Sequence, residues 1–210
     1  MSRFINEFGN FSRKDTGGVE RNFEQITVIG SQAAINDIPG SATFISDEEL
    51  QKFEFTDISR VLASVPGVYV QEEDGYGLRP NIGMRGTGTG RNDKISVMED
   101  GVLVAPAPYS APSAYYFPTM GRMESIEVLK GAASVKYGPR TTGGVLNLLS
   151  RSLPTEPNSS TGMLDAALGS DGYYKGHAYF AKEKNNTAGL IEVFSYGADG
   201  FKELPVGDDN

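Results

Sequence analysis

Arg79-Pro-Asn-Ile-Gly-Met-Arg-Gly86 opens a stretch of sequence that continues to Arg151 and decides the fold. The same stretch contains Val97-Met-Glu-Asp-Gly-Val102, Ile126-Glu-Val-Leu-Lys-Gly131, Tyr137-Gly-Pro139 and Gly143-Gly-Val-Leu-Asn-Leu-Leu-Ser-Arg151. Short apolar runs alternate here with glycine-rich turns and with loops too long for tight hairpins. The pattern predicts a small mixed β-sheet with short helices and long loops, which is an α+β domain.

The composition narrows the classes of function. The 210 residues suffice for one or two domains, and their net charge of −8 argues against a nucleic-acid partner. Cysteine is absent, which excludes a disulfide framework, a thiolate metal site and a cysteine nucleophile. The single histidine, His177, has no second ligand at metal spacing, so we expect no metal site. No apolar run approaches the ~18–20 residues of a transmembrane helix.

Two short helices are expected ahead of the first glycine-rich motif. Ser46, with Glu49 three residues later, is a capping-box signature that begins a helix through about Phe53. A second helix begins at Thr56-Asp57 and is ended by Pro66-Gly67. Apolar residues at helical spacing give it one core-facing side: Ile58, Val61, Leu62 and Val65.

Short strands follow these helices. Asp100-Gly101 lies between two apolar runs and predicts a hairpin. One helical turn is expected over residues 132–137, and a long loop over residues 105–121. The strands that we expect are 68–71, 81–84, 95–99, 102–104, 125–130 and 145–150.

The sequence changes in character after Arg151. Segments 162–168, 173–182 and 188–196 alternate apolar and polar residues, so that Ile191 and Val193, for example, lie opposite Glu192. Apolar-out, polar-in segments of about ten residues are typical of a transmembrane β-barrel. An ordinary antiparallel meander with one wet face has the same period, and periodicity alone leaves both readings open.

Taken together, residues 24–151 resemble the plug of a TonB-dependent outer-membrane receptor, and residues 161–210 resemble the first strands of its barrel. Within this family, Arg79–Gly86 and Ala107-Pro-Tyr-Ser-Ala-Pro112 are similar to the ferric dicitrate receptors. The resemblance divides the chain into a disordered segment 1–23, a TonB-box segment and linker 24–40, a plug 41–153, a linker 154–160 and barrel strands 161–210 of a truncated barrel.

The resemblance implies gated uptake rather than catalysis. The expected cargo is a ferric siderophore, with a citrate-like or carboxylate chelate favoured, and neither a catalytic residue nor a cofactor is expected. The expected partners are TonB with its inner-membrane energising complex, and the bacterial outer membrane, with the plug facing the periplasm. Family barrels have about 22 strands, so a chain with only a few of them is not expected to transport alone. The first residues lack the apolar core of a signal peptide, so the chain is expected to be a processed form or a fragment.

Two other functions remain as alternatives. One is a free-standing module that binds a ligand or TonB without transport. The other is a secreted β-rich carbohydrate-binding or hydrolase domain, which would need a converging acid/base pair. The carboxylates of Glu72-Glu73-Asp74 are better explained as a solvated charge run.

The segment Gln25-Ile-Thr-Val-Ile-Gly30 occupies the place of the family's TonB box. An extended, β-branched segment on a flexible tether can add as a strand to the edge of a partner's sheet. The alternative is an N-terminal strand of the plug itself. The predicted TonB-binding residues are Gln25, Ile26, Thr27, Val28 and Ile29.

The family resemblance also implies a latch and a ligand-facing apex. Arg85 and Lys130 take the positions of cations that reach carboxylates of the barrel wall, although Lys130 lacks the bidentate geometry of arginine. The glycine-rich loop after Arg85 is expected at the apex, where cations meet an anionic chelate and tyrosines pack on it. The predicted ligand-binding residues are Arg91, Asn92, Lys94, Tyr109, Tyr115 and Tyr116. The alternative for all of them is an ordinary solvated surface.

Overall fold

The computed structural model describes residues 10–14, 20–24, 27–52, 56–73, 78–104 and 116–199. The chain divides into two compact units, Met1–Ser152 and Leu153–Asn210. Among the helices in the described ranges, none is long and apolar enough to cross a membrane.

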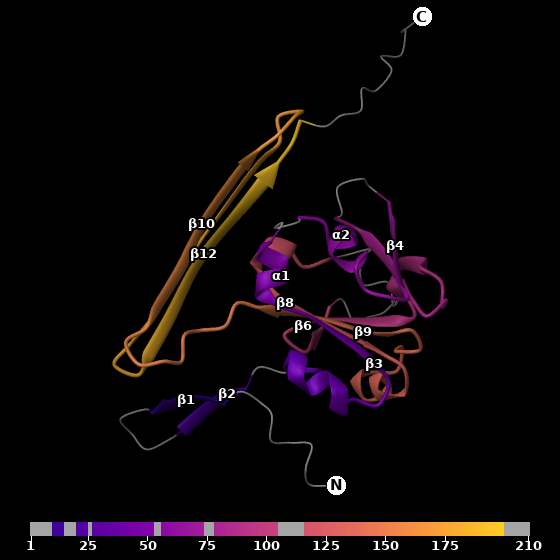
Figure 1. Cartoon of the computed structure of the whole chain (residues 1–210), viewed down its shortest axis with the longest axis horizontal. Coiled ribbons are helices and arrows are strands. Elements are labelled where there is room, and N and C mark those ends of the chain that lie inside the picture. Colours follow the sequence, from indigo (N-terminus) through magenta and orange to yellow (C-terminus); the bar gives the residue numbers. More distant parts are fainter. Residues whose placement is uncertain are drawn as a thin grey trace, which may run out of the picture. The chain divides into compact units, whose positions relative to one another are not determined.

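A five-stranded mixed sheet forms the centre of the first unit (Figure 1). Its strands lie in the order β3, β8, β9, β6, β7, and β6 and β9 are parallel while the other neighbours are antiparallel. The central strands β8 and β9 are almost entirely buried, as their apolar sequences require. The bounds are Ser41–Ile45 for β3, Ile95–Glu99 for β6, Val102–Leu103 for β7, Met123–Lys130 for β8 and Gly144–Ser150 for β9.

The period-two alternation of the strands gives the sheet two different apolar faces. One face packs against α2 and the strand β5 in the main core, which contains Ile58, Leu62, Ile126 and Leu146. The other face carries a smaller cluster of Val28, Ile29, Met98, Leu129 and Val145. Val28 and Ile29, and the half-buried Ala34, Ile35 and Ile38, come from the segment that precedes β3, so residues 28–38 pack onto the sheet.

The two expected helices are present. α1 spans Asp47–Gln51, and Ser46 and Glu49 form the predicted capping box with both hydrogen bonds in place. α2 spans Ile58–Leu62, with Asp57 as its N-cap, and ends earlier than Pro66-Gly67 predicts. Val65 follows in a turn and is still buried in the core, so the apolar spacing identified a buried side rather than the helix end.

Shorter elements complete the first unit. β4 (Val68–Glu72) and β5 (Pro80–Met84) pair as a separate antiparallel hairpin. Three 3-10 helices lie at η2 (Gly90–Asn92), η4 (Met120–Arg122) and η5 (Ala132–Tyr137), the last at the predicted helical turn. A further one, η1 (Gln32–Asp37), lies within the segment 24–40 that was expected to hold the TonB box and a linker.

The expectation of disorder over residues 1–23 is wrong for two short segments. β1 (Asn10–Lys14) and β2 (Glu20–Glu24) pair antiparallel over five residues, with Phe11 opposite Phe23. Polar composition hid this hairpin, because paired strands satisfy each other's backbone groups whatever their side chains are. The remaining residues of 1–23 lie outside the described ranges.

The second unit is a three-stranded antiparallel sheet of β10 (Ser160–Leu168), β11 (Tyr174–Lys184) and β12 (Thr187–Gly197). Asn185 and Asn186 both have positive φ, as a two-residue hairpin turn requires. The side chain of Glu183 accepts the backbone N–H of Asn186 at 2.7 Å and closes this turn. The predicted α+β domain with a mixed sheet, followed by antiparallel strands, is confirmed.

Candidate functional site

A single carboxylate holds the backbone of residues 28–30 against the sheet. Glu127, in the middle of β8, is fully buried and accepts the backbone N–H groups of Val28 at 2.6 Å, Ile29 at 2.9 Å and Gly30 at 2.7 Å. Asn147, its cross-strand neighbour on β9, donates a fourth hydrogen bond at 2.8 Å. A buried carboxylate is tolerated only when its oxygens are hydrogen-bonded, and these four donors meet that need.

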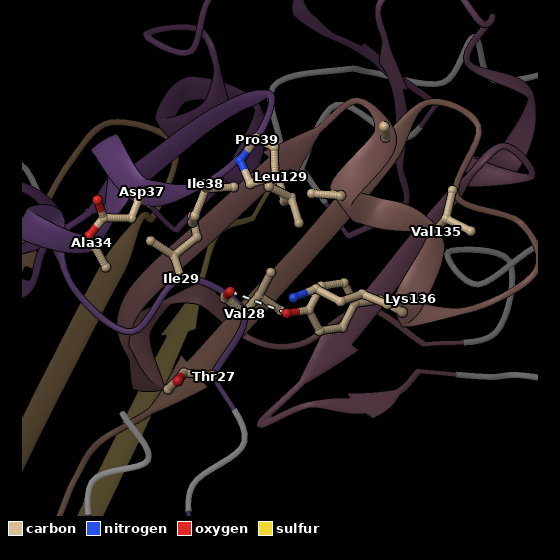
Figure 2. Close-up of a pocket in the computed structure, with 13 residues that line it drawn as sticks. Thr27, Val28, Ile29, Ala34, Asp37, Ile38, Pro39, Leu129, Val135 and Lys136 are labelled. Carbon is tan, nitrogen blue, oxygen red and sulfur yellow. Dashed lines mark hydrogen bonds between the residues drawn. The ribbon is translucent and has the colours of Figure 1, made fainter. Parts of the chain in front are cut away.

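An apolar recess lies beside this segment (Figure 2). Its volume is about 730 Å³, and its lining includes Ile29, Ile38, Leu129 and Val135. The hydroxyl of Tyr137 borders the recess and donates to the carbonyl of Val28 at 3.2 Å. Burial, and then the charge of the Glu127 carboxylate, raise the pKa of Tyr137, so the hydroxyl keeps its proton and remains a donor.

The conformation of residues 27–30 differs from the expected extended strand. Val28 and Ile29 lie in a bend, and Gly30 has φ of +87°. Val28 is 9% exposed and Ile29 is 5% exposed, and both belong to the smaller apolar cluster. This part of the segment is therefore packed on the sheet and does not form a flexible tether. Gln25 and Ile26, the first two predicted TonB-binding residues, lie outside the described ranges.

The two predicted latch cations lie close together. The Lys130 ammonium is buried and donates to the carbonyl of Pro66 at 2.6 Å. Burial, and then the positive charge of Arg85, lower the pKa of Lys130. A Cβ on Gly131 would lie 3.4 Å from Nη1 of Arg85, which places the guanidinium beside the residue that follows Lys130. Within the described ranges, neither cation has a carboxylate at ion-pair distance.

The predicted apex residues of the glycine-rich loop differ in exposure, and the predicted tyrosines form a separate group. Arg91 and Lys94 have exposed side chains, and Lys94 forms an ion pair with Asp93 at 3.2 Å. Asn92 is 1% exposed and its Oδ1 accepts the backbone N–H of Ile82 on β5, so its side chain fixes the loop to the hairpin instead of facing a ligand. In this conformation the Asn92 side chain faces the hairpin, and its contact with a ligand stays a prediction.

The tyrosines of the predicted apex are only partly described. Tyr116 is 46% exposed, and its hydroxyl donates to Glu99 at 3.1 Å and accepts from Arg122 at 2.8 Å. Arg122 is also ion-paired with Glu99, which ties Tyr116 to the end of β6. Tyr109 and Tyr115 lie outside the described ranges.

The sheet of the second unit has the reverse of ordinary polarity. Its exposed face carries large apolar side chains that are 48–89% exposed: Leu164, Leu168, Tyr174, Phe180, Ile191 and Val193. Its other face carries buried polar groups, with Lys175 paired to Asp165 at 2.9 Å and His177 to Glu192 at 2.9 Å. A meander in water would bury the apolar face and hydrate the polar one.

Sequence reasoning missed the role of Glu127. The signal was present, since this residue is the only charged side chain between Ser125 and Leu129, and a carboxylate inside such a run needs buried donors. The donors could not be identified, because they belong to backbone groups 97 to 99 residues earlier in the chain.

Comparison with known proteins agrees with this architecture. The family model of the TonB-dependent receptor plug domain matches residues 34–145, more than half of the chain. A vitamin B12 transporter, BtuB, of Photobacterium profundum is 30% identical over 177 residues, which cover 84% of this chain and 28% of that protein.

Two solved structures share the fold. The ferric citrate transporter FecA in its unliganded form matches with a TM-score of 0.55 at 22% identity, over 80% of this chain and 30% of that one. The ferric yersiniabactin uptake receptor FyuA of Yersinia pestis matches with a TM-score of 0.58 at 20% identity, over 74% of this chain and 24% of that one. All three relatives are named as transporters or receptors and not as enzymes, and this chain spans less than a third of the length of each. The chain belongs to the family of TonB-dependent receptor plug domains.

Proposed function

We propose that this chain is the plug, with the first strands of the barrel wall, of a receptor in the bacterial outer membrane that takes up a small ligand by coupling to TonB. The observation that carries the proposal is the reversed polarity of β10–β12, directly after the plug in the chain. An exposed apolar face with a buried polar face suits a wall with lipid outside and a polar lumen inside. The plug faces the periplasm in this arrangement.

A ferric siderophore is the proposed cargo, and a citrate-like or carboxylate chelate is favoured. Arg91 and Lys94 supply exposed positive charge in the loop after β5, which suits an anionic chelate, and Tyr116 offers a partly exposed ring. FecA and FyuA are named for ferric citrate and ferric yersiniabactin, and BtuB for vitamin B12. Uptake is common to these names, whereas the cargo differs.

Arg85 and Lys130 are proposed as the latch between plug and wall. Burial, and then the positive charge of the neighbouring Arg85, lower the pKa of Lys130, so both act against its charged form. A wall carboxylate placed against the pair would remove this penalty, and breaking such a buried pair costs about 3–5 kcal/mol. Such a latch would stabilise the plug inside the barrel until force is applied to it.

TonB, with its inner-membrane energising complex, is the proposed partner of residues 25–29. Strand addition depends on backbone hydrogen bonds, so proline should abolish it while alanine should not. We expect a chain with both Thr27→Pro and Val28→Pro to lose binding to a purified periplasmic TonB domain in a pull-down. The matched control, Thr27→Ala with Val28→Ala, should retain it. Binding that survives the two prolines would contradict the proposal.

A further inference from the structure

Glu127 uses the backbone donors that a partner strand would need. In an extended strand, successive N–H groups point to opposite sides, so they cannot all reach one acceptor. The N–H groups of Val28, Ile29 and Gly30 converge on the two oxygens of one carboxylate at 2.6–2.9 Å. The segment is consequently bent, and no strand can pair with it in this form.

We propose that Glu127 is a positioning residue that clasps residues 28–30 in a bent, docked form, and that TonB can pair with this segment only after the clasp opens. This inference rests on the proposed TonB-binding role of residues 25–29. It assigns the control of that binding to one side chain, in the middle of the central sheet, that makes no contact with the partner.

The surroundings of Glu127 favour such a clasp. Three successive backbone N–H groups form a concave site for an anion, and the bonds to the carboxylate are as short as charge-assisted bonds are. Asn147 holds the carboxylate from the side, and Tyr137 holds the carbonyl of Val28. The segment is therefore fixed through its backbone N–H and C=O groups, which are the groups that strand addition would also use. The docked form and the TonB-bound form consequently compete for them.

The apolar contacts of the segment involve side chains, so they do not compete with strand addition for backbone groups. Val28 and Ile29 would remain attracted to Leu129 and Val145 whatever the state of the backbone. Their burial favours docking, but it does not decide whether the N–H groups are free. The clasp is thus separable from the packing, and a change confined to the carboxylate can test it.

The first test is amide hydrogen exchange of residues 28–30 in the full chain. Glu127→Gln keeps the shape but replaces one acceptor oxygen by an NH₂ group, which faces backbone donors and cannot accept from them. We expect exchange at these three amides to increase at least about tenfold, the ratio that corresponds to losing about 1.4 kcal/mol of protection. Glu124→Gln is the matched control, because Glu124 lies on the same strand and, within the described part of the chain, its carboxylate accepts from Ser152, so exchange at 28–30 should not change.

The second test is the affinity of the same chains for a periplasmic TonB domain, measured by titration calorimetry. We expect Glu127→Gln to bind several-fold more tightly than the unaltered chain and Glu124→Gln to bind equally. Tyr137→Phe, which frees only the carbonyl of Val28, should shift exchange and affinity in the same direction by less. Binding by all chains with equal affinity would overturn the clasp while leaving the TonB site in place.

The remaining outcomes are also decisive. If no chain binds the TonB domain, the proposed TonB site is contradicted, whereas the exchange measurement still decides whether the clasp exists. If Glu127→Gln does not fold, the unaltered chain provides the answer, because a clasp requires the amides of Val28, Ile29 and Gly30 to be protected. Exchange of those amides at the rate of an unstructured peptide would overturn the inference.

Discussion

Arginine in place of Ile191 is expected to weaken the binding of this chain to phosphatidylcholine vesicles by about 30- to 700-fold. The side chain of Ile191 is 74% exposed, near the middle of β12 on the apolar face of the sheet. A charge on the lipid-facing side of a barrel wall costs roughly 2–4 kcal/mol near the middle of the bilayer, from which the expected ratio follows. Vesicle flotation measures the bound fraction directly.

The neighbouring residue provides the control for this prediction. Leu190 is also aliphatic and on β12, but it lies on the opposite, polar face of the sheet. Leu190→Arg should leave vesicle binding nearly unchanged, because polar groups are tolerated on the lumen side. Equal losses for the two arginines, or an unaltered chain that does not bind vesicles, would contradict a lipid-facing role for this face.

Alanine in place of Gly144 is expected to lower the free energy of unfolding of the plug by roughly 3–5 kcal/mol, within the range of severe single substitutions. Gly144 begins β9 with φ of +156°, and a Cβ there would lie 2.4 Å from the carbonyl oxygen of Leu129 and 2.7 Å from the sulfur of Met84. The Leu129 oxygen belongs to the backbone of the central strand β8, so it cannot move aside without disturbing the sheet.

Urea unfolding followed by circular dichroism measures this effect. Gly90→Ala is the matched control, because Gly90 has an ordinary φ and a Cβ there would meet only Asp93 at 3.7 Å. We expect that control to change stability by less than about 1 kcal/mol. A Gly144→Ala chain as stable as the Gly90→Ala chain would show that the close packing of β8, β9 and β5 is not needed.

The sequence predicted the elements whose causes are local. The capping box of Ser46 and Glu49 and the Asp100-Gly101 hairpin are present, because each depends on residues a few positions apart. The alternation of β10–β12 also predicted which side chains share a face. The alternation could not distinguish a lipid-facing barrel wall from a meander in water, since the two differ only in which face is buried. The structure exposes Ile191 on the apolar face and buries His177 on the opposite face, which supports the barrel wall.

Features that depend on distant parts of the chain were missed or misread. The bend at Val28 and Ile29 exists because Glu127, far along the sequence, collects their N–H groups. Asn92 looked like a ligand-facing loop residue, yet its side chain is buried and accepts the backbone N–H of Ile82, ten residues earlier in the chain. The parallel pairing of β6 with β9 likewise joins segments that have both β7 and β8 between them in the chain.

The most direct test of the account is disulfide cross-linking of Thr27→Cys to a periplasmic TonB domain that carries one cysteine on an exposed edge strand. The chain has no cysteine of its own, so any cross-link reports this position alone. We predict cross-linking at Thr27→Cys that is slow while the segment is docked and faster when the chain also carries Glu127→Gln. At Val102→Cys, a position that is 66% exposed on the β6–β7 hairpin, we predict none above background. Equal cross-linking at the two positions, or none at Thr27→Cys, would contradict the proposal that this segment binds TonB.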